Sequence, residues 1–217
     1  MKTEATPRSS FLKISSAALF AVFVSFMSVF GFAQSGSQFM DGDIIFQTSL
    51  SNQSKAIQAA AKSKYSHMGL IFEEKGKFYV FEASKTVRLT PLEEWIKRGE
   101  DEKYVVKRLK NADKILDAKT LTKLKNESEK FKGKSYDLIF EWSDERIYCS
   151  ELVWKIYKRV VGLEVGKLQK LGDFDLNSAA VKAKLKERYG KNIPLNETVI
   201  SPSSMFESGL LEIVKIN

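Results

Sequence analysis

The chain is poor in the two side chains that most often serve as nucleophile and base, with one cysteine, Cys149, and one histidine, His67, among 217 residues. A single cysteine cannot form a disulfide within its own chain, so it is either an inert core residue or a free thiol. Internal repeats, low-complexity linkers and nucleic-acid-binding motifs are also absent. With 43% hydrophobic and 29% charged residues, the composition is that of an ordinary globular protein. We therefore expect one globular domain and no nucleic-acid partner.

The first 33 residues have the features of a secretory signal peptide. Lys2, Arg8 and Lys13 form a positive region, and an apolar run follows over residues 14–32. Gly31 and Ala33 are small residues at the −3 and −1 positions of a cut after Ala33. This pattern predicts a signal peptide over residues 1–33 and a single exported domain, periplasmic or secreted, over residues 34–217. The alternative is an uncleaved anchor helix, because the apolar run is nearly long enough to span a bilayer. A lipoprotein anchor is excluded, since the only cysteine lies far downstream.

The formal charge of +8 falls to +6 when the first 33 residues, with three basic residues and one acidic residue, are set aside. Such a charge favours attraction to anionic envelope polymers or lipid headgroups. Lysines crowd residues 103–134, but acidic residues are interleaved with them. A solvated helix face is therefore the alternative to a binding patch there.

Cys149 opens a segment with helical periodicity. Apolar residues recur at the spacing of one helix face, and Gly162 can end the helix: Leu152, Val153, Ile156, Tyr157, Val160 and Val161. A thiol in the first turn lies near the positive end of the helix dipole and near unpaired backbone N–H groups, which both favour the thiolate. Two interpretations remain for Cys149, a reactive thiol or a small buried hydrophobic residue.

Two strand patterns, over residues 65–72 and 78–83, are separated by a polar turn and predict a β-hairpin. His67 lies at the start of the first strand and Glu82 near the end of the second, so the hairpin would bring them close together. A cysteine nucleophile needs a base that takes its proton, and the base needs a third group to orient its ring. His67 and Glu82 are candidates for these roles; the alternatives are a structural histidine and a solvated edge carboxylate.

The remaining patterns predict an α+β fold, in which an antiparallel sheet packs against helices, because strands and helices do not alternate regularly as in a parallel sheet. Thr90, Pro91 and Glu93 have the features of a capped helix start. We expect helices near residues 52–63, 90–99, 118–131, 149–162, 178–189 and 202–209, and strands near 44–46, 65–72, 78–83, 104–109, 198–200 and 211–216.

Five short segments follow one another in a characteristic order: GDIIF at 42–46, SHMG at 66–69, FEA at 81–83, YD at 136–137 and YCSEL at 148–152. In this order they resemble the YiiX/YaeF-like permuted papain-like amidases of the NlpC/P60 superfamily, over residues 41–216. The resemblance implies a circularly permuted papain-like fold, in which histidine and acid precede the cysteine helix. It also implies that Cys149 is the nucleophile, His67 the base and Glu82 the orienting acid. Tyr136 and Tyr148 are candidates for contacts to substrate or oxyanion.

The function that the resemblance implies is an exported cysteine amidase or peptidase that forms an acyl-enzyme, with cell-wall peptide as a possible substrate and no metal or cofactor. One alternative is a thiol acyltransferase or esterase acting on lipids, with the apolar run 138–142 lining an acyl groove rather than packing in the core. Another is an envelope-binding protein without turnover. In each case we expect an amide- or acyl-containing envelope partner, and electrostatic association with an anionic envelope surface.

Overall fold

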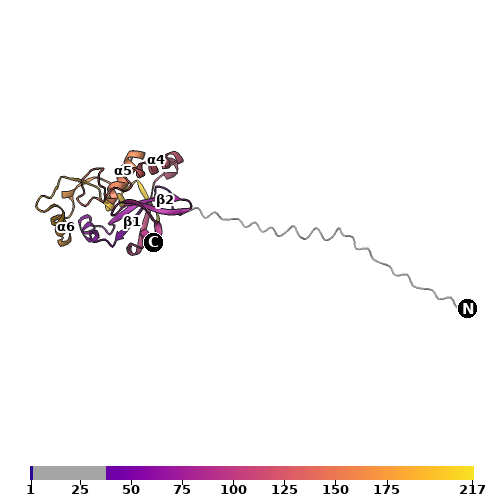
Figure 1. Ribbon diagram of the computed structural model, residues 1–217, viewed down its shortest axis with the longest axis horizontal. Helices are drawn as coiled ribbons and strands as arrows, with labels where there is room; N and C mark the ends of the chain where they lie inside the picture. The colour runs from indigo at the N-terminus through magenta and orange to yellow at the C-terminus, as the bar shows by residue number, and fades with distance from the viewer. Residues whose placement is uncertain (2–37) are drawn as a thin grey trace. The chain divides into compact units, whose positions relative to one another are not determined.

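A six-stranded sheet forms the centre of the protein in the computed structural model, which describes Met1 and residues 38–217 (Figure 1). All neighbouring strands are antiparallel, in the order β4-β3-β2-β1-β5-β8. The six strands are β1 (Ile44–Ser49), β2 (His67–Glu74), β3 (Lys77–Ala83), β4 (Val87–Pro91), β5 (Gly99–Leu109) and β8 (Leu211–Ile216). A separate pair is formed by β6 (Gln169–Lys170) and β7 (Thr198–Val199). The predicted antiparallel α+β architecture is confirmed.

Helices pack on the sheet and around its ends, and α4 and α5 lie beside each other against one face (Figure 1). They are α1 (Ser54–Ala61), α2 (Leu92–Ile96), α3 (Ala112–Ile115), α4 (Ala118–Glu129), α5 (Cys149–Val161), the 3₁₀ turn η1 (Leu171–Asp173), α6 (Ala179–Tyr189) and α7 (Pro202–Phe206). None of the described helices is both long and apolar enough to cross a membrane.

The two faces of the sheet bury separate clusters of side chains, because successive residues of a strand point to opposite faces. Phe46, Leu70 and Phe81 belong to the larger cluster, which includes the buried face of α5. Ile71 and Val80 belong to the smaller one, together with Trp95 of α2. β2 and β3 are therefore covered on both faces, which fixes their register.

Helix α5 is the most deeply buried helix near the sheet. All residues from Cys149 to Tyr157 are buried, including Leu152 and Ile156, which are fully inaccessible. Each such aliphatic side chain contributes on the order of 1.5–3 kcal/mol by leaving water. The helix ends where Gly162 adopts a left-handed conformation with φ of 77° and donates its N–H to Lys158 O. Its start at Cys149 and its end at Gly162 agree with the sequence pattern.

Three local predictions differ from the structure. Helix α1 begins at Ser54, two residues after the predicted start near residue 52, and no side chain caps it. Thr90 does not cap α2 either, because it belongs to β4 and its hydroxyl donates a hydrogen bond to Glu82 instead. The predicted helix over 90–99 is shorter, and Gly99 begins β5.

The predicted signal peptide and its cleavage site at Ala33 lie outside the described residues. Export and the domain limits of 34–217 therefore stay predictions.

Candidate active site

The sole cysteine is the first residue of α5, and its side chain is 3% exposed. Tyr148 before it is extended, so the backbone N–H groups of the first helical turn remain free for other partners. The helix start is held in place by Ser150, whose hydroxyl donates to Ile200 O at 2.7 Å. A thiol at this position lies beside the positive end of a 13-residue helix.

His67 and Glu82 meet on one face of the β2–β3 hairpin. Leu70 pairs with Phe81, so the register places Gly69 opposite Glu82 and puts His67 two residues further along the same face. Across this diagonal, His67 Nε2 lies 2.6 Å from Glu82 Oε2. The close approach depends on Gly69, because a Cβ there would lie 2.5 Å from Val80 Cγ1.

Glu82 is fully buried and remains ionised because its partners outweigh its desolvation. Thr90 Oγ1 donates to Glu82 Oε1 at 2.6 Å, and Arg98 Nη2 donates to the same oxygen. Burial alone would raise the pKa of Glu82, but the hydrogen bond and charge of His67, with Thr90 and Arg98, lower it to about 2. The solvated-edge interpretation of Glu82 is wrong.

His67 is held between this acid and the thiol. Burial would lower the pKa of His67, but hydrogen bonds from its ring to Cys149 and Glu82 outweigh burial and raise the pKa to about 9. Because Nε2 is engaged by Glu82, Nδ1 is the ring nitrogen that remains for the thiol. Trp95 stacks on the imidazole, with ring centroids 5.8 Å apart and an interplanar angle of 24°. The ring is therefore fixed by its neighbours on both its edges and one face.

The arrangement brings a thiol, an imidazole and a carboxylate into one hydrogen-bonded series. An imidazolium that keeps its proton up to about pH 9 favours a thiolate beside it. A thiolate is the nucleophilic form of cysteine, and the same imidazolium can give its proton to a leaving group. The geometry is suited to acyl transfer through a covalent thioester.

The two candidate tyrosines differ in their surroundings. Tyr136 has a buried hydroxyl that accepts a hydrogen bond from Gln53 Nε2 at 2.9 Å. Burial and the nearby Cys149 raise its pKa, so the phenol keeps its proton as a donor. The Tyr148 hydroxyl accepts from Ile200 N at 3.1 Å, deep below the helix start. Both rings line the space beside the thiol.

Two hollows meet at this site. The first, with a volume of about 100 Å³, is lined by Cys149 and almost wholly by apolar side chains of α1, α6 and the segments before α5 and α7. Within the described part of the chain, its only charged lining residues are Lys184 and Arg188. Of the apolar run 138–142, Phe140 lines this pocket, whereas Trp142 packs against Trp154. The second hollow is an open cleft lined by His67.

Four contributors to the site were missed at the sequence level. Thr90 and Arg98 hold Glu82, while Gln53 and Arg188 form a hydrogen-bonded series with Tyr136, since Arg188 Nη2 donates to Gln53 Oε1 at 2.6 Å. The sequence around Thr90 predicts a helix cap instead of a contact with Glu82. Gln53 and Arg188 act across long sequence separations, and Arg98 reaches Glu82 from 16 residues away, outside the predicted hairpin. No local pattern indicates these three residues.

Comparisons with known proteins agree with this geometry. A family model described as "Permuted papain-like amidase enzyme, YaeF/YiiX, C92 family" matches residues 38–215. The chain is 52% identical over 173 residues to the uncharacterized protein YiiX of Escherichia coli strain K12, covering 80% of this chain and 84% of that protein. It superposes with a TM-score of 0.79 on a crystal structure of YiiX from Escherichia coli O157:H7, at 50% identity over 83% of this chain and 98% of that one.

That crystal structure is described as one of a metalloprotein. Within residues 38–217 of the present chain, no group of three or more histidine, cysteine, aspartate or glutamate side chains is placed to hold a metal ion. The site described above is built from this chain's own side chains.

Proposed function

The chain belongs to the permuted papain-like amidases of the YaeF/YiiX, C92 family, and from this premise we propose that it is an exported amidase in which Cys149, His67 and Glu82 form the catalytic triad. Family membership gives the fold and the coarse function, a papain-like cysteine hydrolase. The single observation that supports the triad is the joint contact of His67 with Glu82, at 2.6 Å, and with the Cys149 thiol.

In the proposed reaction the Cys149 thiolate attacks the carbonyl carbon of an amide. The C–N bond breaks, the imidazolium of His67 transfers its proton to the departing nitrogen, and an acyl thioester remains on the enzyme. Water then attacks the thioester with His67 as general base. The products are a carboxylic acid, a free amine and the regenerated thiol–imidazole pair.

The developing oxyanion has two candidate donors. One is the backbone N–H of Cys149, at the start of α5. The other is the hydroxyl of Tyr136, which accepts from Gln53 and therefore keeps its own hydrogen for another acceptor. Tyr148 lines the adjoining pocket, and its hydroxyl accepts a hydrogen bond from Ile200 N.

The triad is tested by the alkylation of Cys149 with iodoacetamide, followed by intact-mass spectrometry. At about pH 6 we expect rapid labelling of the folded protein, because the imidazolium stabilises the thiolate. His67→Ala is expected to slow labelling at least tenfold, and Glu82→Gln less, because it leaves the base in place. Lys77→Gln, far along the same hairpin, serves as the matched control.

Labelling that occurs only after denaturation would return Cys149 to the class of inert core cysteines. Cys149→Ala is expected to abolish turnover while leaving the fold intact.

A second candidate function is a thiol acyltransferase or esterase that acts on lipids. The observation in its favour is the apolar pocket that opens at Cys149 between α1 and α6. An acyl chain seated there would place its carbonyl carbon at the thiol. Hydrolysis rates of matched amides, esters and thioesters of octanoate separate the two functions, since an amidase must turn over the amide.

The cell-wall peptide substrate and the periplasmic or secreted location are part of the same proposal. They rest on the predicted signal peptide and on the formal charge of +6 after residue 33.

A further inference from the structure

The two hollows at the site divide the reacting groups between them. Cys149 lines the apolar pocket, and His67 lines the open cleft. Four residues line both hollows, and the pocket and the cleft join there: Gln53, Tyr136, Lys184 and Arg188. A substrate that reaches from one hollow to the other passes the thiol on one side and the imidazole on the other.

The chemistry assigns a direction to such a substrate. The departing nitrogen receives its proton from His67, so the leaving group must lie on the histidine side. The acyl group must lie on the cysteine side, in the apolar pocket. This assignment rests on the proposed function, because it takes Cys149 as nucleophile and His67 as acid.

The cleft on the histidine side carries an excess of positive charge. The described residues that line it include five cations and one acid: Lys85, Lys97, Arg98, Lys184 and Arg188, against Glu187. Arg98 is engaged by Glu82, and Lys184 pairs with Glu187 at 2.7 Å. Within residues 38–217, the other three cations of the cleft form no ion pair with a carboxylate.

Arg188 is the most constrained of the three. One of its Nη atoms donates to Gln53 Oε1 at 2.6 Å, and its guanidinium lies 4.9 Å from the ring centroid of Phe140. A guanidinium fixed by an amide and an aromatic ring, without a carboxylate partner, keeps donors free in a geometry that matches a carboxylate. Fixing it in advance also reduces the entropy lost on binding.

We propose that this cleft binds a carboxylate carried by the leaving amine, with Arg188 as its contact and with Lys85 and Lys97 adding longer-range attraction. The leaving amine is then an amino acid or a short peptide, and the substrates are N-acyl amino acids or N-acyl peptides. An amide whose leaving amine bears a carboxylate combines the two requirements of the site, a C–N bond at the thiol and an anion beyond the histidine.

The binding test uses the Cys149→Ala protein, so that it does not depend on turnover. Calorimetry compares N-octanoylglycine with N-octanoylglycinamide, which differ only in the negative charge. We expect the carboxylate to bind about tenfold or more tightly, as for hydrogen bonds to charged groups. Arg188→Gln should remove the difference between the two ligands, because it weakens N-octanoylglycine about tenfold more than it weakens N-octanoylglycinamide, which lacks the negative charge.

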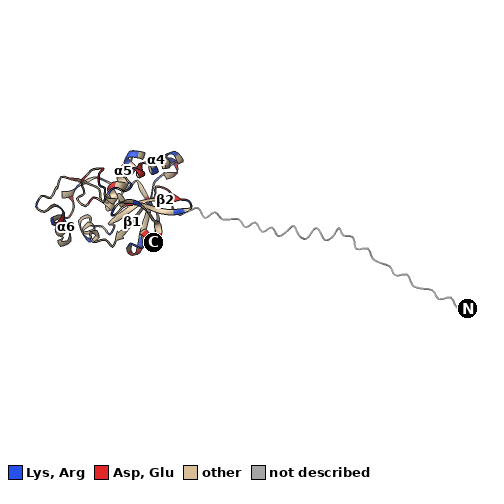
Figure 2. Ribbon diagram, in the orientation of Figure 1, with Lys and Arg blue, Asp and Glu red and all other residues tan. Residues whose placement is uncertain are grey.

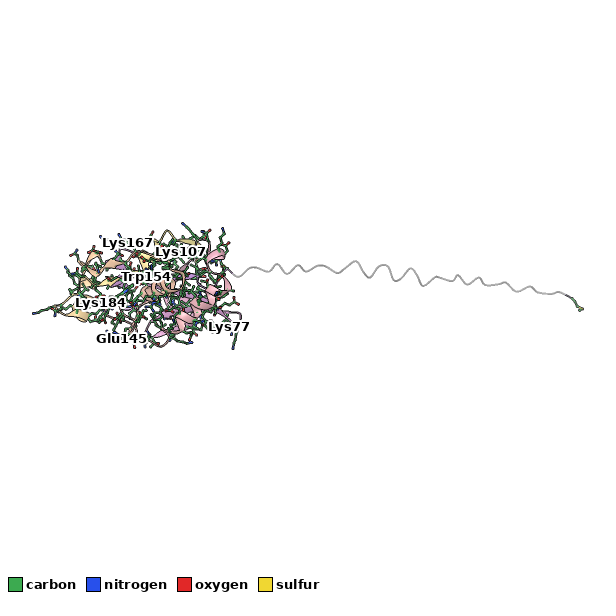
Figure 3. All side chains as sticks on the ribbon, turned by 90° about the horizontal axis from the view of Figure 1, so that it is seen from above. Lys77, Lys107, Glu145, Trp154, Lys167 and Lys184 are labelled. Carbon is green, nitrogen blue, oxygen red and sulfur yellow. The ribbon has the colours of Figure 1, made fainter. Side chains whose placement is uncertain are left out.

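Lysine variants provide a second test that leaves the hydrogen bonds among Arg188, Gln53 and Tyr136 in place. Lys85→Gln combined with Lys97→Gln should weaken N-octanoylglycine and make its binding less sensitive to salt. Lys77→Gln is the matched control, because Lys77 lies at the opposite end of the folded unit from Lys184 of α6 (Figure 3). The control should bind both ligands as the parent does.

Equal binding of the two ligands, or binding of neither, overturns the proposal even if the wild-type protein hydrolyses amides. Tighter binding of N-octanoyl-phosphoethanolamine than of N-octanoylglycine would also overturn it, by replacing the carboxylate with a phosphate. Conversely, charge-dependent binding through Arg188 without hydrolysis by the wild-type protein would sustain the cleft and reject the proposed amidase.

Discussion

Glu82 keeps its negative charge in a fully buried position because it is surrounded by donors. His67, Thr90 and Arg98 reach it from β2, β4 and the segment after α2, and the pKa of the carboxyl falls to about 2 despite burial. Two of these three donors do nothing to the thiol directly. Their effect on chemistry passes through the orientation of His67, which makes Thr90 and Arg98 positioning residues.

The depressed pKa of Glu82 predicts a specific loss of stability in acid. A carboxyl whose pKa is about 2 when folded and 4.5 when unfolded stabilises the fold above pH 4.5, and this contribution disappears as the pH falls through 2. Between pH 5 and pH 3 it should remove about 2 kcal/mol of the free energy of unfolding. Urea titrations at the two pH values measure the change.

Glu82→Gln is the control for this prediction, because it cannot titrate. The variant should be less stable at pH 5 but lose about 2 kcal/mol less than the wild type on going to pH 3. If both proteins lose the same amount, Glu82 does not carry the depressed pKa.

At the scale of elements, the β2–β3 hairpin is what brings base and acid together. Its register places Gly69 directly opposite Glu82, where no side chain fits: a Cβ would lie 2.5 Å from Val80 Cγ1 and 2.7 Å from Phe81 O. The missing side chain lets β2 and β3 stay close where the imidazole crosses to the carboxylate.

Gly69→Ala should therefore destabilise the protein by about 1–3 kcal/mol, because the added methyl group meets a side chain and a backbone oxygen within a packed sheet. Chemical denaturation measures the loss. It should also slow the labelling of Cys149, through displacement of His67. Gly209→Ala is the control, since a Cβ there meets no atom within 4 Å, and its effect should stay within about 0.5 kcal/mol.

The elements of the site that are local in sequence could be predicted. The start of α5 at Cys149 follows from apolar periodicity, and the meeting of His67 with Glu82 follows from one hairpin with a short turn. The neighbours of Thr90 suit a helix start and predict that it caps a helix, yet pairing of β4 with β3 places its hydroxyl beside Glu82. Strand pairing outweighed a local capping signal.

The groups around the two hollows could not be predicted. Gln53 and Arg188 are 135 residues apart, and the packing of α1 against α6 brings them together. No periodicity encodes such a contact. The apolar pocket forms where α1 and α6, which are far apart in the sequence, come together. The apolar run at 138–142 therefore predicts only one residue of the pocket lining, Phe140.

At the scale of the whole molecule, charge is distributed rather than gathered on α4. Both basic and acidic side chains lie on α4 and on α5 (Figure 2). Lys130 and Lys132 pair with Glu127 and Glu129 one turn earlier, and Lys125 pairs with Asp41. These pairs favour the solvated-face interpretation of residues 103–134 over a dedicated binding patch.

Association with anionic vesicles should accordingly be weak and sensitive to salt. Binding measured by co-sedimentation is expected to fall sharply between about 0.1 and 0.5 M salt, because the Debye length drops below ~10 Å. Vesicles of zwitterionic lipid are the control. Binding that persists unchanged in high salt would contradict an electrostatic origin.

Export makes a prediction for the chain as a whole. If residues 1–33 are a signal peptide, the protein isolated from the cell envelope begins near Gln34. Intact-mass spectrometry of the envelope fraction measures this. A product that retains Met1 would reject cleavage and favour the anchor alternative.

The order of the site along the chain has a consequence for its assembly. The base, the acid and the two other donors to the acid lie in β2, β3, β4 and the segment after α2, within 32 consecutive residues: His67, Glu82, Thr90 and Arg98. Neighbouring strands link them. Contacts this local form early in folding, whereas the nucleophile helix must be brought from about 50 residues downstream. A chain that emerges from a ribosome or translocon N-terminus first acquires its base before its nucleophile. The thiol therefore meets the imidazole that stabilises its thiolate only when α5 packs against the sheet, as the fold is completed.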